Sequence, residues 1–402
     1  MRIGVVLGSC VPESGGGYTF SEEILKALRE VDTVHDFVVI GEVPASKVDV
    51  LSGEHVTIRR VRESVFKRVR VHVNRMVESV VGGTYFGQYL FRGNWLKRIV
   101  RQQRLGFVWF ITPKFIDVDV PFIVTVWDLQ HRRQPWFPEV SSRGNWALRE
   151  RNYSTALRRA AYVIVGTKAG RDEVVSYYNV DRERVLNLGH PTPAVSRELG
   201  TGNGAAMLGR YGIPPDYLLY PAQFWPHKNH INLLLALKLL NEEFGMTLSL
   251  VLVGSNKGSL EFVKRKVEEY GQTSRVFFPG FVTRGELIDL FCNASALTYV
   301  TYFGPENLPP LEAFALGCPV VASNVAGAGE QLGDAAVLVD PDDPRDIARA
   351  VKRVHDDSAL REALIRRGRE RAARWTPKHF VGAVIEALDR FEVVRRCWDT
   401  PR

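Results

Sequence analysis

The chain alternates short apolar runs with longer stretches in which apolar residues recur at helical spacing. The runs are rich in Val, Ile, Leu and Phe. Such runs are typical of strands buried on both faces, and their alternation with helices predicts parallel, doubly wound sheets. The predicted strands are residues 2–7, 37–40, 56–58, 107–111, 122–126, 162–165 and 185–188 in the first half, and 218–220, 248–253, 275–278, 296–300, 319–323 and 337–339 in the second.

These two series of strands predict two domains, because 402 residues exceed one ordinary core. The sequence between them, GHPTPAVSRELGTGNGAAM, is rich in Gly, Pro and small polar residues, as linkers are. The last stretch has apolar residues at helical spacing. We therefore predict an α/β chain with two doubly wound Rossmann-like domains at residues 1–192 and 216–378, a linker at 193–215 and a closing helix at 379–402.

The composition predicts a soluble protein, with 45% hydrophobic and 24% charged residues. No apolar run approaches the roughly 20 residues of a membrane-spanning helix, and the N-terminus predicts a strand rather than a signal peptide. The cysteines lack metal-site spacing, which favours free thiols in a reducing cytosol. We therefore expect a cytoplasmic location. The four cysteines are Cys10, Cys292, Cys318 and Cys397.

The charge is unevenly placed along the chain. Residues 1–195 carry 28 Lys and Arg against 20 Asp and Glu, whereas residues 196–402 carry 25 of each sign. Residues 59–104 hold twelve basic residues and two acidic ones, with aromatic residues between them. Such a segment forms either a solvated helical face or a surface that meets an anionic membrane on its cytoplasmic side. No nucleic-acid-binding motif accompanies the charge, so we expect no nucleic acid partner.

The most informative segment is residues 299–341. It predicts a strand, a polar Gly/Pro loop, a helix that opens near Pro309 with Glu312 in its first turn, and a further buried strand. Loops at the carboxyl ends of parallel strands bind ligands in open α/β sheets, and a helix N-terminus suits a phosphate. A carboxylate in such a place can accept hydrogen bonds from vicinal hydroxyls, such as those of a ribose.

This segment resembles the donor-site signature of the retaining GT-B glycosyltransferases of family four, usually written Glu-x7-Glu followed by Ala, small residues, Gly and Pro-Val. The resemblance implies a GT-B fold, an active site in the cleft between the domains, and a last helix that crosses back to the first domain. The first Glu of the signature corresponds to Gly304 here, and Glu306 is a candidate to replace it. The matching residues are Glu312, Ala313, Gly317, Pro319 and Val320.

A glycine-rich loop follows the first predicted strand. Three adjacent glycines, Gly15, Gly16 and Gly17, allow backbone N–H groups to approach an anion closely. A plain tight turn is the alternative. The resemblance implies that this loop faces the phosphates of a nucleotide-sugar donor.

A lysine lies beside a predicted helix in the second domain. Lys228 precedes a helix of about residues 229–244, where its charge can neutralise a diphosphate leaving group. The alternative is a solvated lysine. The resembled family has an Arg five residues earlier, and this chain has Gln223, so we expect His227 or the helix end to assist Lys228.

The resemblance implies further donor contacts in the second domain. Phe281 and Val282 correspond to the backbone that holds the nucleotide base, and Gly254 to a glycine that leaves room for the nucleotide. Thr283 and Glu286 have the spacing of a capping box at the start of the next helix. The loop before Glu312 adds the candidate donor-binding residues Glu306, Asn307 and Leu308.

The first domain supplies candidate catalytic residues after the strand at 122–126. Many members of the resembled family have His-Asp there, and this chain has Trp127 and Asp128, with His131 in the same loop. We predict catalytic roles for Asp128, His131, Lys228 and Glu312. The alternative for a lone histidine is a capping or packing role.

The resemblance implies transfer of a hexose, mannose or similar, from a GDP- or UDP-sugar to a saccharide hydroxyl, with retention of configuration and without a metal or other cofactor. The basic first domain suggests polysaccharide or O-antigen-type glycan assembly on a lipid-linked acceptor. A soluble acceptor is one alternative. The three departures from the family pattern, at Gly304, Trp127 and Gln223, keep open a non-catalytic nucleotide-sugar-binding protein. Epimerases and phosphorylases share the fold, but the signature disfavours them.

Overall fold

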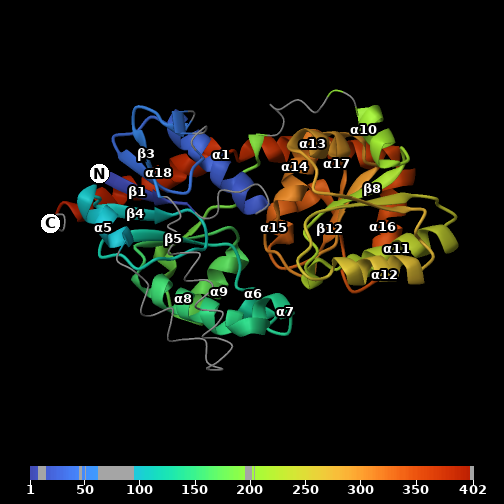
Figure 1. Ribbon diagram of the computed structural model, residues 1–402, viewed down its shortest axis with the longest axis horizontal. Helices are drawn as coiled ribbons and strands as arrows, with labels where there is room; N and C mark the ends of the chain where they lie inside the picture. Colours follow the sequence, from blue (N-terminus) through green and yellow to red (C-terminus); the bar gives the residue numbers. More distant parts are fainter. Residues whose placement is uncertain are drawn as a thin grey trace.

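The computed structural model describes residues 1–7, 15–44, 48–49, 51–61, 95–194, 202 and 204–398, and it confirms the predicted fold class of two Rossmann-like α/β domains (Figure 1). All thirteen predicted strands form, and every pairing within the two sheets is parallel. The first sheet consists of β1 Arg2–Val6, β2 Asp36–Gly41, β3 Val56–Arg60, β4 Phe107–Phe110, β5 Phe122–Val126, β6 Tyr162–Val165 and β7 Val185–Asn187. The second consists of β8 Tyr217–Pro221, β9 Ser249–Val253, β10 Val276–Gly280, β11 Ala296–Tyr299, β12 Val320–Ser323 and β13 Ala336–Val339.

The strand order explains where ligands can bind. The first sheet has the order β3-β2-β1-β4-β5-β6-β7, and the second has the order β10-β9-β8-β11-β12-β13. The direction of winding therefore reverses between β1 and β4 and between β8 and β11, and crevices form at such switch points beyond the carboxyl ends of the strands. The loops after β1, β8 and β11 carry the predicted glycine loop, Lys228 and the segment before Glu312.

The strand sequences account for the burial. Every residue of β5 and β9 is buried, as expected for apolar runs covered by helices on both faces. The edge strand β3 buries only Val56 fully. The covering helices are α1 Gly16–Glu30, α5 Trp95–Gln102, α6 Gln130–Arg133, α7 Pro138–Ser141, α8 Asn145–Arg159, α9 Lys168–Tyr178, α10 Gly204–Tyr211, α11 His230–Glu242, α12 Leu260–Glu269, α13 Arg284–Asn293, α14 Leu308–Leu316, α15 Ala328–Leu332, α16 Pro344–Asp356, α17 Ser358–Arg374 and α18 Pro377–Arg395.

The C-terminal helix α18 joins the two domains. It runs along the first domain, so the C-terminus lies on the same side of the molecule as the N-terminus (Figure 1). Phe380 packs edge-on against Phe20 of α1 with ring centroids 5.6 Å apart, and Phe391 packs against Phe107 of β4 at 5.1 Å. This is the crossing that the family resemblance implied.

The predicted linker contains a helix. Within residues 193–215, α10 packs on α13 of the second domain, and Arg210 forms an ion pair with Glu286. The predicted capping box of α13 is confirmed, because Thr283 and Glu286 exchange hydrogen bonds at its start. The domain boundaries themselves stay a prediction.

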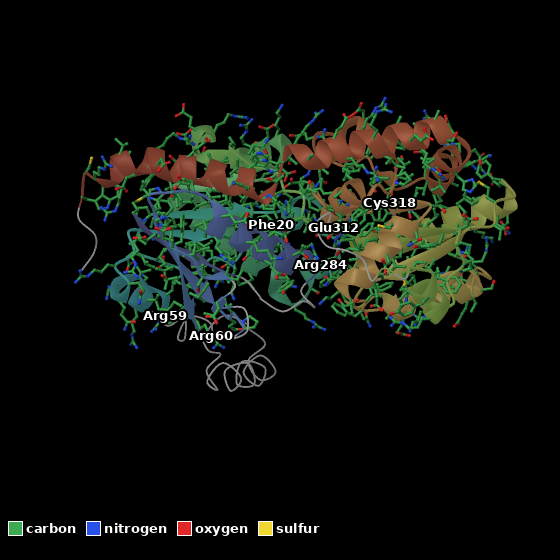
Figure 2. All side chains as sticks on the ribbon, turned by 90° about the horizontal axis from the view of Figure 1, so that it is seen from above. Phe20, Arg59, Arg60, Arg284, Glu312 and Cys318 are labelled. Atoms are coloured by element: carbon green, nitrogen blue, oxygen red, sulfur yellow. The ribbon has the colours of Figure 1, made fainter. Side chains whose placement is uncertain are left out.

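Several predictions concern residues outside the described part of the chain. Most of the basic segment 59–104 lies there, as does Cys10. Arg59 and Arg60 are described at the end of β3, and Figure 2 shows them on the first domain. Cys292, Cys318 and Cys397 are free thiols. No helix in the described ranges has the length and apolar character needed to cross a membrane.

Candidate functional site

The glycines at the start of α1 lie against the second domain. Gly15 has a φ of 69°, which favours glycine. A Cβ at Gly15 would lie 3.4 Å from Nε2 of Gln223, and a Cβ at Gly16 would lie 3.2 Å from Cδ1 of Leu308. The structure therefore brings together the predicted glycine loop, the loop after β8 and the start of α14.

Trp127 occupies the place where the resemblance implies a histidine. Its ring lies edge-on to Phe20 at 5.9 Å and 6.0 Å from the ring of His190, and a Cβ at Gly17 would lie 3.1 Å from it. The bulky indole therefore packs beneath the start of α1. It supplies no imidazole to this part of the interface.

Lys228 ends a 3₁₀ turn, Pro226–Lys228, between β8 and α11. Its backbone carbonyl accepts a hydrogen bond from the hydroxyl of Tyr220 at 2.5 Å. Its Nζ donates to the hydroxyl of Tyr299 at 3.0 Å and to Oδ1 of Asn307 at 3.4 Å, and it lies 5.1 Å from the centre of the Tyr299 ring. These partners are neutral, so they orient the ammonium group without cancelling its charge. An anion can therefore interact with the full charge of this lysine.

The loop before α14 disfavours a side chain at position 304. Gly304 has a φ of 143°, and a Cβ there would lie 2.7 Å from Oδ1 of Asn307. Asn307 donates from Nδ2 to the Gly304 carbonyl at 3.0 Å, and its backbone N–H and C=O bond the amide of Gln331 at 3.0 and 2.9 Å. Position 304 thus carries no carboxylate, and this loop contacts Nζ of Lys228 through the neutral amide of Asn307.

Glu312 lies on α14 and is buried. Figure 2 shows Glu312 on the side of the second domain that faces the first. Its role stays a prediction.

Glu306 reaches into the first domain. Its carboxylate accepts hydrogen bonds from the backbone N–H of His190 at 2.6 Å and pairs with His190 Nδ1 at 2.7 Å. The Glu306 side chain is 4% exposed. A Cβ at Gly166 would overlap Oε2 of Glu306, and a Cβ at Gly189 would lie 3.1 Å from Oε1. Two glycines, which follow β6 and β7, therefore leave a slot that the Glu306 carboxylate fills. Because Glu306 is bound to His190 in this slot, it does not substitute for a carboxylate at position 304.

A second acidic residue, Glu330 of α15, also bonds the first domain. Its two carboxylate oxygens accept from the backbone N–H groups of Lys168 and Ala169 at 2.8 and 3.2 Å. These are first-turn N–H groups of α9, where the helix dipole favours a negative charge. Loops of the predicted donor domain are therefore tied directly to the first domain.

Asp128 is held by an arginine. Its Oδ1 accepts from the backbone N–H of Gln130 at 2.9 Å and from Nη2 of Arg149 on α8. Burial alone would raise the pKa of Asp128, but the Arg149 guanidinium outweighs burial and holds that pKa below its ordinary value. Asp128 is therefore an ionised carboxylate, suited to orienting a cation or hydroxyls rather than to donating a proton.

His131 lies in the interior of the first domain, not at the interface. It is 0% exposed, stacks on Tyr153, and its Nε2 contacts the hydroxyl of Tyr178 at 3.2 Å and Oε2 of Glu150 at 3.3 Å. Burial and then the charge of Arg149 lower its pKa to about 4. The geometry corrects the catalytic role predicted for His131, because a fully enclosed ring cannot touch a substrate. The packing alternative holds.

The His131 pKa makes a prediction about stability. The folded-state pKa of about 4 lies below the ordinary 6.5, so the unfolded chain binds more protons between these values and stability is lost as pH falls through this window. From pH 7 to pH 5 this loss amounts to about 2 kcal/mol. His131→Phe keeps an aromatic ring but cannot titrate. We therefore expect its free energy of unfolding to fall by about 2 kcal/mol less than that of the wild type between pH 7 and pH 5, as measured by urea unfolding at both pH values. Equal decreases in the two proteins would contradict the assignment.

The remaining predicted residues lie around the loop ends of the second sheet. A Cβ at Gly254 would overlap the carbonyl oxygen of Ala222, so the close approach of two backbone segments requires glycine there. Phe281 is exposed and Val282 is buried, directly after β10. The structure gives these residues structural reasons to be present, and their contacts with a nucleotide stay predictions.

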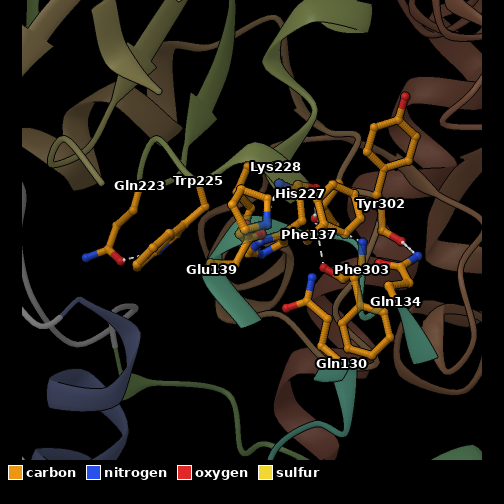
Figure 3. Close-up of polar contacts among 12 residues, drawn as sticks. Gln130, Gln134, Phe137, Glu139, Gln223, Trp225, His227, Lys228, Tyr302 and Phe303 are labelled. Atoms are coloured by element: carbon orange, nitrogen blue, oxygen red, sulfur yellow. Dashed lines mark hydrogen bonds and ion pairs between the residues drawn. The ribbon is translucent and has the colours of Figure 1, made fainter. Parts of the chain in front are cut away.

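The interface also contains residues that sequence reasoning did not select. Glu139 of α7 accepts from both the backbone N–H and Nδ1 of His227, and Gln134 donates from Nε2 to the Tyr302 carbonyl at 3.1 Å (Figure 3). No local pattern marks them, because their partners lie 88 and 168 residues away. Within the described ranges, no cluster of three or more His, Cys, Asp or Glu could hold a metal ion.

Comparison with known proteins finds a family match within the second domain. Residues 212–371 match the family described as Glycosyl transferases group 1. The serotype-specific mannosyltransferase WbdA of Escherichia coli is 26% identical over 246 residues, which are 60% of this chain and 30% of that protein. The O-antigen chain mannosyltransferase B of Escherichia coli is 25% identical over 251 residues, 62% of this chain and 66% of that protein. The chain thus spans less than a third of the length of WbdA and about two thirds of the second relative.

A solved structure extends the likeness to the whole chain. HepE of Anabaena, in complex with UDP and glucose, has a TM-score of 0.69 and 16% identity, covering 97% of this chain and 100% of that one. Identity at this level concerns the fold alone. It agrees with the two parallel sheets described above.

Proposed function

We propose that this chain is a retaining hexosyltransferase that uses a nucleoside-diphosphate sugar, because residues 212–371 match the glycosyl transferases group 1 family and the whole chain has the GT-B fold. The observation that carries this proposal is the position of Lys228. Its ammonium group keeps its full charge among neutral partners, at the switch point of the second sheet and beside the start of α14. This position suits a diphosphate, which carries negative charge that increases as the sugar leaves.

The proposed reaction is a front-face displacement. The bond between the anomeric carbon and the diphosphate oxygen breaks, the acceptor hydroxyl oxygen bonds the same face of that carbon, and the hydroxyl proton passes to the departing diphosphate. Lys228, the N–H groups at the start of α1 and the N-terminus of α14 would stabilise the departing charge, and Glu312 would hold the ribose hydroxyls. Asp128, kept ionised by Arg149, would stabilise positive charge on the sugar ring. The anomer formed, determined by NMR, tests retention.

The choice of donor and acceptor follows from the relatives. Two of them are named mannosyltransferases, one of them an O-antigen chain enzyme, and HepE binds UDP and glucose. We therefore propose a GDP- or UDP-hexose donor and a saccharide acceptor of a lipid-linked glycan, with a soluble saccharide as the alternative. The basic segment 59–104 would bring the enzyme to the anionic cytoplasmic face of a membrane. Liposome flotation with and without anionic lipid tests that contact.

Donor binding is tested by thermal unfolding with GDP, UDP, dTDP and ADP and their sugar conjugates. A nucleotide present at about 100 times its dissociation constant adds about 2.7 kcal/mol of stability. We expect one base class to raise the melting temperature, and we expect the shift and the subsequent sugar transfer to persist in EDTA. No shift with any nucleotide would instead favour a non-catalytic protein, and loss of transfer in EDTA would refute metal independence.

A further inference from the structure

A carboxylate of the first domain holds the turn that carries Lys228. Glu139 lies on α7, directly after Pro138 at the start of the helix. Its Oε1 accepts from the backbone N–H of His227 at 3.2 Å and also from Nδ1 of the same residue. The Glu139 and His227 side chains are only 6% and 14% exposed. Figure 3 shows the two side chains meeting beside Lys228.

The opposite side of this turn is fixed by the loop after β11. The carbonyl of His227 accepts from the backbone N–H of Tyr302 at 2.8 Å and from Oγ1 of Thr301 at 3.0 Å. Phe137, two residues before Glu139, packs against the rings of both His227 and Tyr302 at 6.2 and 6.0 Å. The backbone immediately before Lys228 is therefore held between the first domain and the loop that leads to α14.

We propose that Glu139 is a positioning residue that acts through His227 to place the ammonium group of Lys228, so that Lys228 reaches its working position only when the two domains are closed. The inference rests on the proposed function of Lys228. Separation of the domains removes Glu139 from His227 and leaves the turn attached on one side only. Correct placement has a large effect on rate, because a displacement of about 1 Å can cost about 100-fold.

The protonation states fit this role. Burial lowers the pKa of His227, and Glu139 opposes that decrease only in part. The Glu139 pKa also lies below its ordinary value, because hydrogen bonds from His227 outweigh burial. At neutral pH a neutral imidazole thus donates its Nδ1 proton to an ionised carboxylate, which is a short, directional bond that fixes the ring. A positive charge on His227 would instead lie beside Lys228 and repel it.

An ordinary contact between domains would have different consequences from a positioning contact. If Glu139 acts through Lys228, its removal has no further effect once Lys228 is gone. If Glu139 merely fastens the domains together, its removal has the same effect with or without Lys228. Glu330 is a matched control, because it is another carboxylate that bonds across the domains but contacts α9 rather than the Lys228 turn.

The test is a double-mutant cycle on the full chain. The release of GDP from GDP-mannose, or of UDP from UDP-glucose if only that donor is used, is measured for Glu139→Ala, Lys228→Ala and the pair. We expect Glu139→Ala alone to lower kcat about tenfold or more, with less change in the donor KM. Added to the Lys228→Ala protein, the same substitution should not lower kcat further. Glu330→Ala should have equal effects in both backgrounds. Glu139→Gln, which keeps an oxygen acceptor, should recover most of kcat.

Each result decides the question. Equal effects of Glu139→Ala in the two backgrounds, or no effect on kcat, would overturn the positioning role while leaving the proposed function intact. A wild type that releases nucleotide from neither donor would overturn the proposed function and this inference with it. If Glu139→Ala does not fold, His227→Ala removes the same side-chain bond, and its cycle with Lys228→Ala is interpreted in the same way.

Discussion

Replacing Lys228 with alanine is expected to lower kcat for sugar transfer by about 10²- to 10³-fold, which is the loss typical when one preorganised donor to developing negative charge is removed. The donor KM should rise less, because the diphosphate gains charge as the sugar departs and the missing ammonium therefore matters most in the transition state. Tyr299 and Asn307 contact Nζ but are neutral, so they cannot replace it. Steady-state rates with the donor identified by thermal unfolding provide the measurement.

The matched control is Lys238→Ala on α11, the helix that follows the turn of Lys228. That side chain is 40% exposed and faces Glu242 at 3.8 Å, so its loss removes a positive charge of the same kind away from the candidate site. We expect it to leave kcat unchanged. A Lys228→Ala protein with the kcat of the wild type would refute the role given to this lysine.

The fold could be predicted from the sequence because its signals are local. A buried parallel strand is apolar over consecutive residues, and each of the thirteen runs is a strand in the structure. The capping box of α13 was equally visible, since Thr283 and Glu286 lie three residues apart. Helix α10 within the predicted linker was not, because it is short and its packing on α13 depends on tertiary contacts.

The site could be predicted only in part, because several of its contacts join residues that are far apart in the sequence. Motifs next to strand ends predict Lys228 and Glu312, and the contacts of both residues with a donor stay predictions. The pairing of Glu306 with His190 joins residues 116 positions apart, and no spacing rule reveals it. His131 was assigned to the site because it follows a strand, but α8 and α9 enclose it with Tyr153 and Tyr178. Whether a polar residue that follows a strand belongs to the site therefore depends on burial by helices that are distant in sequence.

The slot that receives Glu306 predicts an unusual response to a small substitution. Gly166 has no positive φ, so alanine there would ordinarily stabilise the protein by about 0.4–1 kcal/mol by restricting the unfolded chain. With the domains closed as described, the added Cβ overlaps the carboxylate of Glu306 and displaces it from His190. We expect Gly166→Ala to destabilise the protein by about 1–3 kcal/mol in urea unfolding and to increase the radius of gyration in small-angle X-ray scattering.

A second substitution separates the clash from other effects. Glu306→Ala removes the carboxylate and also costs stability, because His190 loses its buried partner. Since the Cβ added by Gly166→Ala then enters vacated space, the double variant should be no less stable than Glu306→Ala alone. Gly209→Ala is the control, because a Cβ there meets nothing within 4 Å and the residue lies on α10. If Gly166→Ala stabilises the protein as Gly209→Ala should, the domains in solution do not rest with Glu306 in its slot, and the contacts that tie the Lys228 turn to the first domain must then form only when the donor binds.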